Sequence, residues 1–237
     1  QATALSEALK TVPGLKPELF DVLFDEDGAY VTYGRYERTW DVFRRTEVFR
    51  PDPQRDLDLI QSLSYDQVHR PCANVRLHPL PVPAVGNPDW DAEVADGHWS
   101  LQVAVFYNTD TMRSRRQAAA EYCRILREQG EEAYYHHGPA VSAVMVGSFP
   151  PEAVQAEQRT LFGVGGRRQT AVNRITDPRL ASQKVRFPHN LENGHRVNDL
   201  VEDRQTRQKR RVPRASILVV LPRAEREEAE QGMGGLN

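Results

Sequence analysis

The stretch from His98 to Phe149 constrains the fold of this 237-residue chain more than any other. Trp99 to Phe106 alternates in polarity and is rich in β-branched and aromatic residues, which predicts a strand. A helical pattern follows from Asp110 to Gln129, and two further strands are predicted from Glu132 to His136 and from Val141 to Phe149. The middle of the chain therefore has the predicted order strand, helix, strand, strand.

The predicted helices of this region carry end signals. Asp110 or Thr111 is expected to cap the start of the central helix, and Gly130 stands where a glycine commonly follows a helix end. A second helix is predicted to begin at Pro150-Pro151-Glu152 and to run to about Thr160, because prolines are favoured in the first turn of a helix.

The apolar periodicity is lost from Gly163 to Arg214. This stretch is polar and arginine-rich, so we predict a long insertion with little regular structure, of the kind that often carries a function. Ser216 to Leu221 is a continuous apolar run, which predicts a central, well-buried strand. The residues after Pro222 form a charged tail.

The N-terminal part of the chain shows a related order of elements. Asp52 at an N-cap and Pro53 at the first helical position are typical of a helix start. Asp25 to Gly28 predicts a turn between antiparallel strands, while Trp40 to Arg50 fits either a loop or a short helix. A helix is predicted at residues 1–12, and strands at residues 19–24, 29–36 and 73–80.

The two parts of the chain share an internal repeat. Val31 to Tyr36 matches Val144 to Phe149, since each contains a glycine followed two residues later by an aromatic residue. Two units of the order βαββαβ are therefore predicted, and the opening strand of the first is missing or lies upstream of Gln1. Each unit would form an antiparallel sheet with its helices on one face, so the predicted fold is α+β with two tandem ferredoxin-like units.

Proline-rich and polar stretches suggest where these units begin and end. The predicted organisation is a degenerate first unit at residues 1–82, a proline-rich linker at 83–97, a second unit at 98–222 with an Arg-rich insertion at 163–214, and a charged tail at 223–237.

Gln102 on its strand, the helix that follows and Val144 to Phe149 together resemble a SPOR domain, the sporulation-related repeat of bacterial cell-envelope proteins. The resemblance covers about residues 98–160 and 215–222 and, more faintly, residues 1–80. It implies a tandem SPOR-like protein that is exported to the envelope or periplasm and binds peptidoglycan glycan strands. Any export signal or lipid anchor is expected to lie upstream of Gln1.

The resemblance places the glycan on the sheet face that the helices leave open. Gln102 falls where the family has a glutamine that faces the glycan, and Ala104, Tyr135 and Met145 are expected on the same face. A peptidoglycan strand or a related polysaccharide is therefore the expected ligand.

A basic segment supports an alternative function as a structural subunit of a larger protein assembly. A solvated loop, or contacts with an acidic partner protein, explains this segment better than nucleic-acid binding, because it has no interleaved aromatic residues and lies beside Glu202 and Asp203. The basic residues of this predicted partner-binding arm are Arg207, Lys209, Arg210, Arg211 and Arg214.

Composition and spacing argue against several other classes. The net charge of −2 gives no general case for nucleic acid, and no apolar run approaches the length of a membrane span. His136 and His137 are neighbours on a strand and point to opposite faces, so no metal site or other cofactor is expected. No catalytic set can be proposed, and the chain is predicted not to be an enzyme. Cys72 and Cys123 are interpreted as small buried hydrophobic residues.

Overall fold

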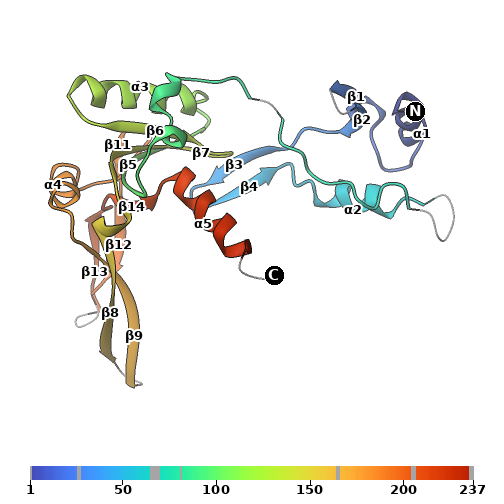
Figure 1. The fold of residues 1–237 in the computed structure, drawn as a ribbon. Helices are drawn as coiled ribbons and strands as arrows, with labels where there is room; N and C mark the ends of the chain where they lie inside the picture. Colours follow the sequence, from blue (N-terminus) through green and yellow to red (C-terminus); the bar gives the residue numbers. More distant parts are fainter. Residues whose placement is uncertain are drawn as a thin grey trace. The chain divides into compact units, whose positions relative to one another are not determined.

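The computed structural model describes residues 2–25, 28–64, 70–80, 82–163, 166–203 and 207–234 of the chain. They fall into two compact units, Gln1–Val82 and Pro83–Asn237 (Figure 1). The described residues form five α-helices together with antiparallel and mixed sheets, so the predicted α+β class is confirmed.

The sheet of the second unit is built around β5 (Trp99–Tyr107). β7 (Val141–Phe149) pairs antiparallel with one edge of β5, and β6 (Ala133–His137) pairs antiparallel with β7. β14 (Ile217–Val220) pairs antiparallel with the other edge of β5, which gives the strand order β14–β5–β7–β6. The C-terminal apolar run thus belongs to the same sheet as the central strands.

A second segment shares the outer edge of β5 with β14. β10 (Leu191–Glu192) pairs parallel with Ala104 and Val105, whereas β14 pairs with Trp99–Gln102. β14 is therefore an edge strand with Ile217 45% exposed, and the prediction of a central, well-buried strand is wrong. Its run is continuously apolar because Leu218 packs into the core on one face of the sheet and Val219 into the core on the other.

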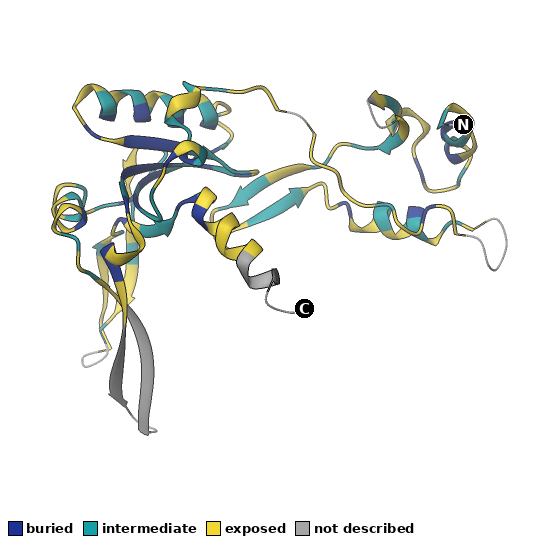
Figure 2. Cartoon of the chain, viewed as in Figure 1, coloured by how far each residue is buried: buried dark blue, intermediate teal, exposed yellow. Residues whose placement is uncertain are grey.

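Two helices cover one face of this sheet, α3 (Arg115–Glu128) and α4 (Pro178–Arg186). The residues between them and the strands are fully buried and form the main core, which Figure 2 shows in dark blue along the central strands. This core includes Leu101, Val144 and Val146 from the sheet, Ala119, Cys123 and Leu126 from α3, and Leu180 from α4. Burial of these side chains provides the main driving force for folding of the unit.

The second helix lies later in the sequence than predicted. After Pro150 the chain makes only a 3-10 turn, η4 (Pro151–Ala153), and then enters a strand. The helix that fills the predicted place is α4, whose N-cap Asp177 accepts hydrogen bonds from the backbone N–H groups of Arg179 and Leu180. The helix after Asp52, predicted from the same Asp-Pro pair, begins one residue later than expected, at Gln54, and its N-cap is Pro53 and not Asp52.

The predicted insertion contains regular structure, so the prediction of an irregular stretch is wrong. Two separate antiparallel hairpins lie within or beside it, β8–β9 and β12–β13. The remaining elements of the second unit are η2 (Pro88–Trp90), η3 (Ala92–Val94), β8 (Val154–Gly163), β9 (Gly166–Ile175), β11 (His195–Arg196), β12 (Asn198–Glu202), β13 (Lys209–Pro213) and α5 (Pro222–Gly234). Residues 164 and 165 of the predicted insertion lie outside the described part of the chain.

The start of α3 also differs from the prediction. Asp110 and Thr111 precede the helix and belong to a turn in which Thr109 Oγ1 accepts a hydrogen bond from the backbone N–H of Met112. Asn108 accepts from the backbone N–H of Arg115, the first residue of the helix. The predicted cap at Asp110 or Thr111 is therefore wrong, whereas Gly130 adopts φ +84° just after the helix end, as predicted.

The first unit has a small core of its own. It contains α1 (Ala2–Lys10), η1 (Pro17–Leu19), β1 (Phe20–Asp25), β2 (Gly28–Tyr33), β3 (Glu37–Asp41), β4 (Thr46–Arg50) and α2 (Gln54–Ser62). Its buried apolar residues are Leu9, Leu15, Ile60 and Cys72. Part of the turn predicted at 25–28, residues 26 and 27, lies outside the described residues.

The strands of the first unit do not form the predicted single sheet. In the described residues, β1–β2 and β3–β4 are two separate two-stranded sheets, and residues 73–80 form no strand. Extended chain near Pro79 alternates in polarity without pairing, because proline lacks the N–H group that a sheet needs. The tandem arrangement of two ferredoxin-like units is therefore not confirmed.

Trp40 to Arg50 forms a hairpin rather than a loop or a short helix. Asp41 makes the turn possible, since its Oδ1 accepts hydrogen bonds from the backbone N–H groups of Phe43 and Arg44 at 3.0 and 2.9 Å. Arg45 completes the turn with φ 53°. The short aspartate side chain thus substitutes for backbone acceptors at the tip.

Candidate binding surface

The four residues predicted on one open sheet face lie on two different faces. Gln102 pairs with Met145 across β5 and β7. Ala104 pairs with Val144, and Val144 pairs with Tyr135. Since directly paired residues point to the same side of a sheet, Ala104 and Tyr135 face the helices, and Gln102 and Met145 face the other way.

A β-bulge explains the difference. The register shifts between Gln102 and Ala104, where Val103 is an extra residue opposite the consecutive pair Val144 and Met145. Counting every second residue therefore fails at this point, and Val103 and Ala104 both enter the helix-side core. No pattern of polarity in the sequence marks this bulge.

Burial also removes most of the predicted site from solvent. Ala104 is 0% exposed and Tyr135 2% exposed within the main core, and Met145 is 4% exposed within a second core on the opposite face. Gln102 is the one residue of the four that keeps partial exposure. The prediction of an uncovered face formed by all four residues is wrong.

The face opposite α3 and α4 is covered by two short segments. The second core joins strand residues to the segment of η3, through Ala92 and Ala95, and to Leu221, which directly precedes α5. Its buried members are Ala92, Ala95, Tyr134, Met145 and Leu221. The segment predicted as a linker therefore packs on the second unit.

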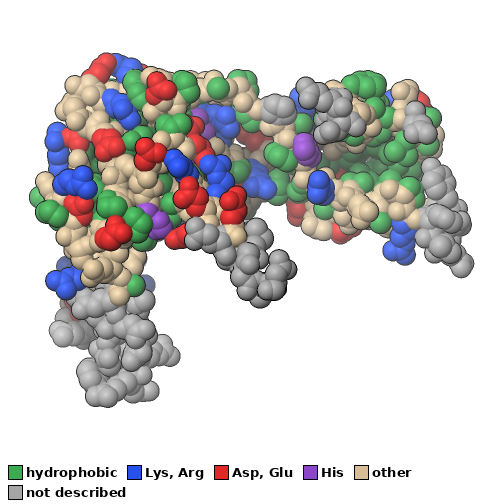
Figure 3. Space-filling view, viewed as in Figure 1, with side chains coloured by type: hydrophobic (Ala, Val, Ile, Leu, Met, Phe, Trp, Pro, Cys, Tyr) green, Lys and Arg blue, Asp and Glu red, His purple; other side chains and the backbone are tan. Residues whose placement is uncertain are grey.

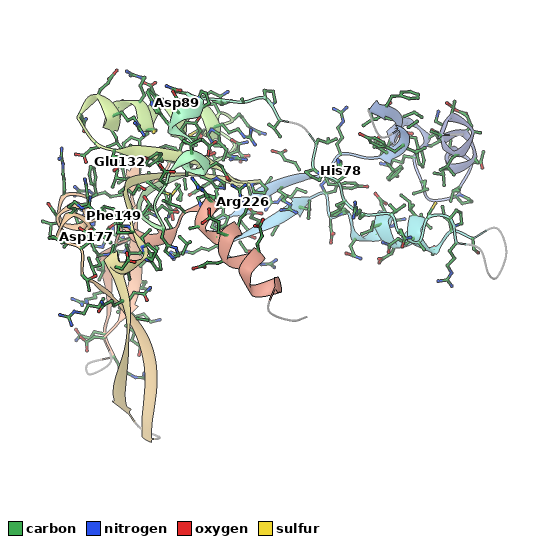
Figure 4. All side chains as sticks on the ribbon, viewed as in Figure 1. His78, Asp89, Glu132, Phe149, Asp177 and Arg226 are labelled. Atoms are coloured by element: carbon green, nitrogen blue, oxygen red, sulfur yellow. The ribbon has the colours of Figure 1, made fainter. Side chains whose placement is uncertain are left out.

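Surface ion pairs hold α5 over this second core. Arg223 pairs with Asp96 at 2.8 Å, and Arg226, labelled on α5 in Figure 4, pairs with Glu93 at 2.5 Å. These side chains are mostly solvent-exposed, so each pair contributes little, about 0–1 kcal/mol. Figure 3 shows basic and acidic side chains interspersed over the visible face of this unit, without a large patch of one sign.

The aromatic and histidine residues of β6 are used in packing. Tyr134 donates its hydroxyl hydrogen to Glu132 at 2.8 Å, and burial together with this carboxylate raises the pKa of Tyr134 to about 12. Tyr135 donates to the backbone oxygen of Asn87 at 2.8 Å and stacks on His137 with ring centroids 4.6 Å apart. The described residues contain no group of three or more His, Cys, Asp and Glu side chains that could hold a metal ion.

A chain of hydrogen-bonded polar groups connects β6 to Val85, near the start of the segment 83–97 that was predicted as a linker. Arg115 donates to Ser142 Oγ at 2.7 Å, Ser142 lies 3.0 Å from His137 Nδ1, and His137 Nε2 lies 3.1 Å from the backbone oxygen of Val85. Because a carbonyl oxygen only accepts, the consistent assignment has the hydrogen on Nε2 and a neutral ring. Burial lowers the pKa of His137 and favours this neutral form.

The predicted arm is the β12–β13 hairpin. Lys209, Arg210 and Arg211 lie on β13 and are exposed, and Arg207 pairs with Glu202 at 3.0 Å. Leu200 and Val201 on β12 are 63% and 42% exposed. The arm therefore presents apolar and cationic side chains together, because Leu200 pairs with Arg211 and Val201 with Arg210.

Arg214 has a different role from the other basic residues of this segment. Its side chain is 13% exposed and contacts the carboxylates of Glu192 and Asp199, with Nη2 2.8 Å from Asp199 Oδ1. Glu192 also accepts a hydrogen bond from the Tyr107 hydroxyl at 3.1 Å. Arg214 thus fixes the base of the arm to the end of β5 and is not available to a partner.

Sequence reasoning missed two exposed apolar sites. Leu200 and Val201 stand in the sequence as scattered apolar residues, and their direct alignment with basic residues on a short hairpin is visible only once the register is known. Val42 and Phe43 lie at the turn of the β3–β4 hairpin and are 45% and 99% exposed. The sequence Asp-Val-Phe-Arg-Arg at 41–45 is the signal, since aspartate commonly begins such turns.

The two cysteines lie in the cores of their units. Cys72 and Cys123 are free thiols and both are buried, which confirms their interpretation as small hydrophobic residues. Burial raises the pKa of Cys123 to about 11, so its thiol stays protonated at neutral pH and is a poor nucleophile.

Comparisons with protein-family models, with curated proteins and with solved structures gave no match to this chain. Within the described residues, no helix has the length and apolar character needed to cross a membrane.

Proposed function

We propose that this chain is a non-catalytic subunit of a larger protein assembly, in which the β12–β13 arm contacts an acidic surface of a neighbouring protein. One observation carries the proposal: the arm exposes Leu200, Val201, Lys209, Arg210 and Arg211, while Arg214, whose side chain is 13% exposed, holds its base. A fixed base keeps the arm in one orientation and lowers the entropy lost when it binds.

The mixture of side chains on the arm fits a protein partner better than a nucleic acid. Exposed leucine and valine gain free energy when they are buried against apolar atoms, and the three cations of β13 match carboxylates around such a contact. The arm also carries Asp199, Glu202 and Asp203, which would oppose a phosphate backbone.

Site-specific photo-cross-linking tests this function. A photo-reactive residue is placed at Arg210 in cells that produce the protein, and the same residue at Arg113, which is 77% exposed outside the arm, gives the background. We expect a discrete cross-linked protein from position 210, which is lost when Lys209 and Arg211 are both changed to Glu. Cross-linking at 210 no stronger than at 113 would remove the proposal.

A matched charge-reversal variant controls for net charge. Arg55 and Arg174 are exposed and lie outside the arm, so the double change of these residues to Glu alters the charge as much as K209E/R211E does. We expect the arm variant alone to lose the cross-linked partner. If both double variants lose it equally, the contact depends on overall charge and not on the arm.

We also propose a second function, docking on peptidoglycan glycan strands in the bacterial envelope or periplasm. The strand order of the second unit supports it, because the order β14–β5–β7–β6 with α3 and α4 on one face fits the ferredoxin-like unit that the SPOR resemblance implies. Gln102 faces away from the helices in this arrangement and is partly exposed. Binding through this face would require α5 and the η3 segment to move.

The proposed duplication of this unit also has structural support. Gly34 and Gly147 occupy equivalent places in the sequence repeat, and both adopt positive φ, 69° and 74°. In each case an aromatic ring two residues later packs against the glycine, so that an added Cβ would lie 2.7 Å from Tyr36 or 2.4 Å from Phe149. This shared local geometry is the strongest argument for a common origin of the two units.

Retention on purified sacculi tests glycan docking. The full chain is compared with Gln102→Ala and with a chain that ends at Pro222, which lacks the remainder of the α5 cover. We expect stronger retention of the shortened chain and loss of that gain when Gln102→Ala is added. No retention of either chain would eliminate this function and leave the assembly proposal untouched.

A further inference from the structure

The turn of the β3–β4 hairpin presents apolar side chains fully to solvent. Phe43 is 99% exposed and Val42 is 45% exposed, and the two are adjacent at the end of a two-stranded sheet. Burial normally removes a phenylalanine ring from water, because leaving it exposed forgoes its full hydrophobic contribution. We call residues 42–45 the β3–β4 tip.

The tip is held in one conformation by its own hydrogen bonds. Asp41 Oδ1 accepts from the backbone N–H groups of Phe43 and Arg44, and the backbone oxygen of Asp41 accepts from the N–H of Arg45 at 2.7 Å. Three backbone donors of the tip are thus satisfied internally. A segment that enters an apolar medium must satisfy its donors in this way, since water is not there to accept from them.

Cationic side chains follow the apolar pair directly. Arg44 is 78% exposed on its side chain and Arg45 is also exposed, and both adjoin Phe43 in the turn. Residues 37–50 of the hairpin carry four arginines against three carboxylates, so this hairpin has a net charge of +1 although the whole chain is slightly negative. Cations beside an apolar tip complement the phosphate groups that border the acyl region of a bilayer.

We propose that the β3–β4 tip is a shallow membrane-insertion element, in which Phe43 and Val42 enter the surface of an anionic lipid bilayer and Arg44 and Arg45 contact its phosphate groups. The apolar part is confined to two neighbouring residues at a narrow turn and is bordered by charge, which fits an interface better than a protein pocket. This interaction is independent of the β12–β13 arm, which lies in the other unit.

Co-sedimentation with vesicles tests the proposal. The full chain is mixed with vesicles of phosphatidylcholine containing about one third phosphatidylglycerol, and with vesicles of phosphatidylcholine alone. We expect binding to the anionic vesicles, weaker binding to the neutral ones, and a decrease as salt is raised from 0.1 to 0.5 M, with about tenfold or greater loss for Phe43→Ala.

Phe24→Ala is the matched control. Phe24 is 75% exposed on the other hairpin of the same unit, so its replacement removes another largely exposed ring from outside the tip. We expect this variant to bind vesicles within about twofold of the unchanged chain. Arg44→Glu should weaken binding to anionic vesicles and leave binding to neutral vesicles unchanged, because it alters charge without removing the apolar residues.

Several outcomes would overturn the proposal. The first is no binding of the full chain to anionic vesicles, which would favour an apolar pocket on a partner protein as the occupant. The second is equal loss in Phe43→Ala and Phe24→Ala, which would indicate non-specific adsorption. Thermal melts of each variant establish that the fold is intact, as expected for changes at exposed positions.

Discussion

Replacing Arg214 by methionine tests whether the base of the β12–β13 arm is fixed as described. Methionine retains most of the apolar stem and removes the charge. Glu192, whose side chain is 12% exposed, is then left with the Tyr107 hydroxyl as its remaining described side-chain partner. Asp199 is 32% exposed and can be solvated by water.

The free-energy cost depends on these exposures. Leaving a fully buried charge without its partner costs about 3–5 kcal/mol, and a hydrogen bond between charged groups contributes about 1.5–3 kcal/mol. Because Asp199 is partly exposed, the loss on its side is discounted, and we expect R214M to destabilise the second unit by about 2–4 kcal/mol. For a unit of this size, that corresponds to a decrease in Tm of roughly 4–16 °C.

Urea unfolding followed by circular dichroism measures the change, and hydrogen exchange locates it. Exchange of the amides in β12 and β13 should accelerate more than exchange in β5 and β7, since the arm can open without loss of the main core. Removing the stranded carboxylate with E192Q should restore part of the stability, so the double variant is expected about 1–2 kcal/mol more stable than the sum of the single changes predicts.

Arg113→Met is the control, because Arg113 is 77% exposed and its loss should change stability by less than about 0.5 kcal/mol. If R214M has an effect as small as this control, and exchange in the arm is unchanged, Arg214 does not fix the arm. If the proposed assembly contact is correct, R214M should also weaken cross-linking from position 210, although Lys209 and Arg211 are intact.

Three further predictions concern the second unit. Leu180→Ala should lower the free energy of unfolding in urea by about 2–5 kcal/mol, because Leu180 is fully buried. Val185→Ala on the same helix, at a position 80% exposed, should lower it by less than about 0.5 kcal/mol. Similar effects of the two changes would mean that α4 does not pack on the sheet. Gly147→Ala should destabilise by more than about 2 kcal/mol, since its Cβ would lie 2.4 Å from the ring of Phe149, whereas Gly130→Ala meets no atom within 4 Å and should cost only the strain of its positive φ, about 1 kcal/mol. Because the pKa of His137 is lowered in the folded protein, the unfolded chain takes up a proton at a higher pH than the folded one. The contribution of neutral His137 to the free energy of unfolding is therefore complete above about pH 6.5 and is lost as pH falls below that value, by at most about 1.4 kcal/mol per pH unit. His137→Asn should remove this part of the pH dependence of stability, and an unchanged profile would contradict the neutral assignment.

Much of the second unit could be predicted from local patterns. The predicted bounds of β5, β6 and β7 agree with the structure nearly to the residue, because these strands combine alternation with β-branched and aromatic residues. The prediction of a helix after Pro150 is wrong because a proline-containing start is equally compatible with a 3-10 turn that leads into a strand. Pairing across ten residues between β8 and β9 decides the structure of that segment, and such pairing is a non-local property.

The site was harder to predict than the fold. The position of Gln102 was correct relative to Met145, but the bulge at Val103 placed Ala104 and Tyr135 on the other face. The cover over Met145 comes from Ala92, Ala95 and Leu221, which are small or distant in sequence and give no signal of mutual contact. Glycan docking, envelope location and absence of catalysis stay predictions.

The shared outer edge of β5 has a consequence for synthesis of the chain. β5, α3, β6 and β7 can assemble once Phe149 has left the ribosome, but β14, which pairs with Trp99–Gln102, is made about 70 residues later. At ordinary translation speeds of about 5–20 residues per second, the edge of β5 that pairs with β14 stays unpaired for roughly 4–14 s. During that interval the nascent protein has a free strand edge, where a chaperone or a second nascent chain could pair before β14 arrives.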